Sequence, residues 1–165
     1  MRFKQLALDG AALAIIGTLM SPAGALAQKT REAGVRAEIE QLNIECGWYL
    51  DHAMFDAFAG CFTTEARLGV TGGQPIVGRP AIRARYGAMP AGRTVRHFAG
   101  PVHLTWEDAR HVRGLRSVSI YASDVPAPRP PISPTIMDYQ ELYERGADGK
   151  WRYAERIVTP VFGGP

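Results

Sequence analysis

Two short segments of the sequence could bring a carboxylate and an imidazole together. The segment Trp48–Asp51 ends an apolar helical pattern with the carboxylate of Asp51, and the strand-like run Thr94–Gly100 carries the imidazole of His97. Where a carboxylate and a histidine meet in an apolar pocket, the carboxylate orients the ring and makes it a general base near neutral pH. Whether the side chains of Asp51 and His97 meet in the fold decides whether the chain carries such a pair.

Each member of this pair also has an ordinary structural interpretation. His97 could be packed within a sheet with both ring nitrogens bonded to backbone or water, and Asp51 could face water at the end of a helix. A carboxylate that faced a pocket without a partner would cost several kcal/mol, because it would be a buried, uncompensated charge. If Asp51 faces a pocket, His97 is its natural partner.

Further polar side chains could contact a substrate. Asp138 and Gln140 lie two residues apart in an extended segment, so their side chains share one face of the strand. If that face points inward, it adds a carboxylate and an amide to the pocket. If it points outward, the opposite face, with Tyr139 and Tyr143, forms the core or an oligomer interface. Tyr49 could donate its hydroxyl to a substrate carbonyl or belong to the core.

These residues have to be positioned by helices that are followed by a series of strands. Apolar residues at steps of three and four predict a long amphipathic helix and two shorter ones, over residues 31–53, 54–62 and 81–88. Extended segments are predicted over residues 66–70, 74–77, 94–106, 112–123, 136–145 and 151–161, with a loop in the proline-rich piece 125–134. This order indicates an α+β fold, in which helices close the concave face of a curved sheet around a cavity.

The first 27 residues have the pattern of a signal peptide. Arg2 and Lys4 precede a short apolar stretch, and Ala25-Leu26-Ala27 fits the small-x-small cleavage pattern. We expect cleavage after Ala27, no stable membrane anchor, and export to a bacterial periplasm or secretion. The mature protein would then be a single domain over residues 28–165.

Composition and cysteine content limit the remaining interpretations. The 19 basic and 16 acidic residues are interspersed, which argues against a nucleic-acid-binding protein because such proteins carry a basic stripe. Cys46 and Cys61 are the two cysteines of the chain and lack metal-ligand spacing. Two buried thiols are the favoured interpretation. A disulfide is the alternative that an exported protein permits.

Several motifs, in their order along the chain, carry a resemblance to a known family. They are Tyr49-Leu50-Asp51 before Phe55-Asp56-Ala57-Phe58, then Gly78-Arg79-Pro80-Ala81-Ile82, Arg96-His97-Phe98 and the closing Asp148-Gly149-Lys150-Trp151-Arg152-Tyr153. Over about residues 33–160 the chain resembles the SnoaL-like branch of the nuclear transport factor 2-like superfamily. The resemblance implies a cone-shaped barrel made of a strongly curved, mostly antiparallel sheet, closed by about three helices around one deep cavity. A shared fold does not by itself define the reaction.

Dehydratase-like members of this family imply a role for particular residues. Their aspartate near the end of the first long helix matches Asp51, and their histidine on the first long strand matches His97. Scytalone dehydratase has a second histidine on the next strand, where this chain offers Ser119 or Tyr121 instead. Its serine and asparagine on the following strand match Asp138 and Gln140 in this chain. These differences indicate a different substrate.

The resemblance implies a lyase or isomerase that needs no cofactor and no metal. Asp51 would fix the tautomer of His97, which would remove a proton beside a carbonyl or a leaving group. The predicted substrate-contacting residues are Tyr49, Ser119, Tyr121, Asp138 and Gln140. The expected partner is a small, mostly apolar molecule. The alternative is a non-catalytic ligand-binding or assembly module of the same fold.

Arginines beside aromatic residues recur along the predicted strands. Arg116 and Arg156 are examples, and we expect them to face solvent or a partner subunit. This pattern predicts a homodimer or another homo-oligomer.

Overall fold

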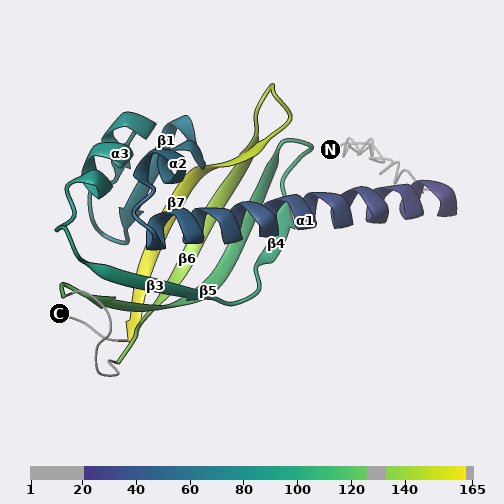
Figure 1. Cartoon of the computed structure of the whole chain (residues 1–165). Helices are drawn as coiled ribbons and strands as arrows, with labels where there is room; N and C mark the ends of the chain where they lie inside the picture. The colour runs from purple at the N-terminus through teal and green to yellow at the C-terminus, as the bar shows by residue number, and fades with distance from the viewer. Residues whose placement is uncertain (1–20, 126–132, 163–165) are drawn as a thin grey trace, which may run out of the picture.

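A computed structural model describes residues 21–125 and 133–162 and shows helices packed on one curved sheet (Figure 1). The helices of these residues are α1 (Pro22–Asp51), α2 (Phe55–Gly60) and α3 (Arg79–Gly87). Helix α1 is 30 residues long and begins at a conventional cap, where the Ser21 side chain accepts a hydrogen bond from the backbone N–H of Gly24. Among the described residues, no helix is both long enough and apolar enough to cross a membrane.

Helix α1 begins earlier than the sequence pattern predicts. The apolar periodicity starts near residue 31, whereas the helix starts at Pro22 and runs through the predicted cleavage site after Ala27. Alanine, leucine and glutamine are good helix formers, so this segment can be helical without a face to bury. Most of the predicted signal peptide, residues 1–20, lies outside the described part of the chain.

The strands form a mixed sheet in the order β2-β1-β7-β6-β5-β3, with β4 also paired to β5. Their bounds are β1 (Phe62–Val70), β2 (Ile76–Val77), β3 (Thr94–Ala99), β4 (His103–Trp106), β5 (His111–Ser123), β6 (Thr135–Arg145) and β7 (Trp151–Phe162). Strands β1 and β7 run parallel, and all other pairs are antiparallel. The sheet is strongly curved but open, since its edge strands β2 and β3 do not pair. The predicted α+β fold is therefore confirmed, without full closure of the barrel.

Two strands replace the single extended segment predicted over residues 94–106. Gly100 and Pro101 separate β3 from β4, because proline has no amide to donate to a ladder. The backbone N–H of Gly100 still bonds to the carbonyl of Ser117, at 2.9 Å, so both strands stay on β5. Most of the predicted proline-rich loop lies outside the described residues.

The core lies between α1 and the concave face of the sheet, which α1 crosses in Figure 1. Val35, Ile39 and Cys46 of α1 are buried there. Strand β6 supplies Tyr139, Glu141 and Tyr143 to the same side, while Asp138 and Gln140 are exposed on the other. The second of the two predicted orientations of this strand is therefore the observed one.

Cys46 and Cys61 form a disulfide, so the favoured prediction of two free thiols is wrong. Helices α1 and α2 pack against each other and bring the two Cα atoms to 6.2 Å, within the range that a disulfide spans. The bond ties the C-terminal part of α1 to the residue that follows α2. Asp51 lies just beyond this tie.

Candidate active site

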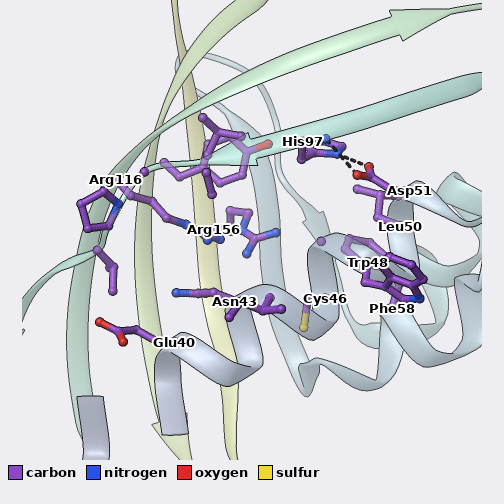
Figure 2. Close-up of a pocket in the computed structure, with 18 residues that line it drawn as sticks. Glu40, Asn43, Cys46, Trp48, Leu50, Asp51, Phe58, His97, Arg116 and Arg156 are labelled. Carbon is purple, nitrogen blue, oxygen red and sulfur yellow. Dashed lines mark hydrogen bonds and ion pairs between the residues drawn. The ribbon is translucent and has the colours of Figure 1, made fainter. Parts of the chain in front are cut away.

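A cavity of about 520 Å³ lies between α1 and the concave face of the sheet. Its walls combine apolar side chains such as Val102 and Val118 with a few polar groups. Asp51 and His97 lie together at one end, and the two arginines Arg116 and Arg156 lie apart from them (Figure 2). The volume suits a small molecule of two or three rings.

Asp51 and His97 are joined by two hydrogen bonds. The His97 ring nitrogen Nδ1 lies 2.5 Å from Oδ1 of Asp51, and the His97 backbone N–H donates to Oδ2 of Asp51 at 2.9 Å. Both side chains are largely buried, with 13% of the His97 side chain and 9% of the Asp51 side chain exposed. The structure thus brings together the two residues that the sequence placed on separate elements.

The end of α1 and the start of β3 are locked to each other around this pair. Arg96 donates from Nη1 to the backbone carbonyl of Asp51 at 3.0 Å, and the amide of Met54 bonds to the carbonyl of Tyr49 at 2.8 Å as the chain leaves the helix. Both oxygens of the Asp51 carboxylate are used by one histidine. The ring is therefore fixed in position and in orientation.

This geometry determines which ring nitrogen can act as a base. An ionised carboxylate only accepts hydrogen bonds, so Nδ1 of His97 carries a proton and donates it to Asp51. The neutral ring then has its lone pair on Nε2, and any proton that His97 removes goes to that atom. The pair has the arrangement of a general base with an orienting carboxylate.

The other predicted site residues are not brought to this cavity. Tyr49 packs against the core. Ser119 and Tyr121 lie on the face of β5 opposite to the one with the cavity-lining Arg116 and Val118. Tyr121 contacts the exposed ring of Phe98 edge to face. Residues two apart share a strand face, so a prediction that assigns the wrong face of a strand to the cavity places both residues of the pair outside it.

Asp138 and Gln140 are exposed for the same reason. The carboxylate of Asp138 accepts a hydrogen bond from the Ser117 hydroxyl at 2.6 Å on the outer face of the sheet. Neither residue lines the cavity. Their assignment as substrate-contacting residues, with that of Tyr49, Ser119 and Tyr121, is corrected by these positions.

Arg116 and Arg156 were expected to face solvent or a partner subunit, but they line the cavity. Only 6% and 7% of their side chains are exposed. Both arginines bind Glu141: Arg116 Nη2 donates to Oε1 at 2.9 Å, and Arg156 Nε donates to the same oxygen at 2.8 Å. The sequence could have indicated this for Arg116, because Arg116 lies an even number of residues from the apolar Val112 and Val118 and therefore shares their face of β5.

Hydroxyl groups complete the polar network behind the arginines. Tyr143 donates to Oε2 of Glu141, and Tyr153 donates to Oδ1 of Asn43 at 2.6 Å. Burial by itself would raise the pKa of Glu141, but the guanidiniums of Arg156 and Arg116 outweigh that effect and lower it. Glu141 is therefore an anion between two cations.

Comparison with known proteins is consistent with this architecture. The sequence profile of the SnoaL-like domain family matches residues 31–157. The chain belongs to the SnoaL-like domain family. No curated protein sequence matches it.

Solved structures of similar fold come from several bacteria. A nuclear transport factor 2-like protein with a cystatin-like fold from Novosphingobium aromaticivorans has a TM-score of 0.70 and 20% identity, over 84% of this chain and 90% of that one. A candidate scytalone dehydratase from the same organism has a TM-score of 0.68 and 15% identity, over 82% and 89%. A protein from Catenulispora acidiphila, in complex with S-DNPA, has a TM-score of 0.65 and 22% identity, over 78% and 94%. At these identities the likeness shows the fold.

Proposed function

We propose that this SnoaL-like protein is a cofactor-independent lyase or isomerase in which His97 is the general base. The observation that carries the proposal is the buried Asp51–His97 pair on the wall of a cavity that can hold a small molecule. The Nε2 atom of His97 takes a proton from a carbon beside a carbonyl. The electron pair left behind then either expels a leaving group on the adjacent carbon or is protonated again at a new position.

Support from the comparisons concerns the class of chemistry. Structural neighbours include a candidate scytalone dehydratase, and another neighbour holds a small organic molecule. The particular use of Asp51 and His97 rests on the geometry of this chain.

The test is a proton-transfer reaction that does not require the natural substrate. We expect the protein to accelerate exchange of the C2 protons of 1-tetralone in deuterated buffer, followed by proton NMR. Exchange that matches buffer alone, across 1-tetralone and a small set of two-ring ketones, would favour the alternative: a ligand-binding module with the same cavity.

We also propose that the protein forms a homo-oligomer, most simply a dimer. The outer face of β3 and β5 exposes large apolar side chains, with 63% of Phe98 and 53% of Leu115 accessible. Apolar and aromatic side chains of this kind are enriched at subunit interfaces. Light scattering at micromolar concentration should give about twice the mass of the mature chain. A monomer mass would contradict this, and Phe98→Asp should convert a dimer to a monomer.

We further propose that the protein is exported and begins at Gln28 after processing. The disulfide between Cys46 and Cys61 supports this, because such bonds persist in oxidising compartments. Cleavage would remove residues 22–27 from the start of α1, which lie ahead of its first buried residue, Val35. N-terminal sequencing of the exported protein should read from Gln28, and an intact Met1 would contradict the proposal.

A further inference from the structure

The cavity wall opposite the base carries more positive than negative charge. The guanidiniums of Arg116 and Arg156 share one carboxylate, that of Glu141, whose side chain has no exposed surface. The two arginines line the cavity, while Glu141 lies behind them and does not. A ligand in the cavity therefore meets the two cations and not the anion.

Neighbouring groups do not neutralise the second guanidinium. Burial raises the pKa of Tyr139 to about 12 and also raises the pKa values of Tyr143 and Tyr153, so all three remain neutral hydroxyls. The ring centroid of Tyr153 lies 3.9 Å from the Arg156 guanidinium carbon, which is a cation–π contact. Such a contact stabilises a cation, and it leaves the net charge of the cluster unchanged.

The hydrogen-bonding capacity of both guanidiniums is also incompletely used. Nε of Arg116 and Nη2 of Arg156 are buried without a hydrogen-bond acceptor among the described residues. Nη2 of Arg156 lies 2.7 Å from Oε1 of Glu141, but not at a hydrogen-bonding angle. A buried cation with unused donors is costly, so the present partners of the two guanidiniums leave both incompletely stabilised.

Other carboxylates on the cavity wall are engaged elsewhere. Asp51 is held by His97 at the far end (Figure 2). Glu40 is half exposed and lies 3.9 Å from Arg36. Neither carboxylate contacts the guanidiniums of Arg116 or Arg156.

We propose that Arg116 and Arg156 form a subsite for the carboxylate group of an otherwise apolar ligand. The cluster has a net charge of one, which matches a monoanion, and the planar guanidinium fork suits a carboxylate. This proposal depends on the proposed function in one respect, because it treats the bound ligand as the molecule on which His97 acts. The carboxylate is held at one end, and the carbon that loses a proton lies near His97 at the other.

The strand register supports two separate ends for one ligand. His97 on β3 is paired with Ile120 on β5, four residues along β5 from Arg116. At about 3.3 Å per residue, the two positions lie roughly 13 Å apart along the strand. A long arginine side chain shortens that gap, so a two-ring skeleton with a carboxylate can reach both ends.

Calorimetric titration with two probes of nearly equal shape tests this subsite. 2-Naphthoate carries the carboxylate, and 2-naphthamide is its neutral counterpart. We expect the mature protein to bind 2-naphthoate at least about tenfold more tightly, as for a desolvated charge-assisted contact. Equal affinity for the two probes, or no binding of 2-naphthoate, would overturn the proposal.

Substitutions test whether the preference for 2-naphthoate over 2-naphthamide depends on these two arginines. Arg116→Met and Arg156→Met should each remove most of it, and each leaves Glu141 paired with the remaining arginine, so the fold should survive. Arg113→Met is the matched control on β5, because Arg113 is exposed and pairs with Glu107 outside the cavity. If the preference persists in both cavity variants, the subsite is refuted. Should either variant fail to fold, the wild-type comparison of the two probes still decides the proposal.

The binding test is independent of catalysis. His97→Gln should keep the preference for 2-naphthoate, since the ring lies at the other end of the cavity. A protein that prefers 2-naphthoate but transfers no proton would keep the subsite and refute the proposed base. The converse result would keep the base and refute the subsite.

Discussion

Replacement of His97 by alanine should reduce the rate of proton exchange at 1-tetralone by about a hundredfold or more, the range expected for a general base. The variant loses the only ring that Asp51 orients, and no other imidazole lines the described cavity. His97→Ala should remain folded, because the ring contributes little to the apolar core. The measurement is the exchange rate by proton NMR, with circular dichroism as the check on folding.

Asp51→Asn should lose nearly as much activity as His97→Ala. The amide can present its NH₂ group to Nδ1, which would shift the ring proton to Nε2 and leave no basic nitrogen facing the cavity. His111→Ala is the matched control, since His111 forms a similar pair with Asp108, at 2.8 Å, outside the cavity. An Asp51→Asn variant with wild-type exchange rates would contradict the orienting role of the carboxylate.

Loss of the Cys46–Cys61 disulfide should lower the free energy of unfolding by about 3 kcal/mol, because the bond closes a loop of this length in the unfolded chain. For a domain of this size, that corresponds to a decrease in Tm of roughly 10 °C. The measurement is thermal unfolding of the mature protein with and without a reductant. The reduced protein should also lose activity at temperatures below its Tm, because the bond anchors the part of α1 that carries Asp51.

The double variant Cys46→Ala, Cys61→Ala provides the control for this prediction. Its Tm should be lower than that of the wild-type protein and should not respond to the reductant. A wild-type protein whose Tm is unchanged by reduction would show that the bond contributes little, and that packing alone holds α1 against α2.

Local patterns in the sequence were sufficient for the order of the elements. The three- and four-residue spacing of apolar residues predicted α1, and glycine and proline marked most of the turns. Boundaries were less predictable, since β1 begins at Phe62, where the sequence suggested a helix. Thr63 and Thr64 have low helix propensity, and Phe62 pairs with Tyr153 of β7, so the segment joins the sheet instead.

The candidate site was predictable only in part. Asp51 and His97 could be proposed because each interrupts an apolar segment, and family resemblance linked them. Four predicted contacts on β5 and β6 were misplaced because alternation along a strand defines two faces without saying which one is buried. The fifth, Tyr49 on α1, packs against the core instead. Arg116 and Arg156 were missed because an isolated arginine on a strand is usually exposed.

The sequence by itself determined that this chain is an α+β domain with a carboxylate and an imidazole on two separated elements. The tertiary structure decided that these two meet, that the cysteines bond, and that Glu141 is buried between two arginines. Each of those contacts joins residues distant in sequence, such as Asp51 and His97, 46 positions apart. Such contacts depend on sheet register and helix packing. A charge can be buried only where these bring a partner from another element to it, because an unpaired buried charge is strongly destabilising.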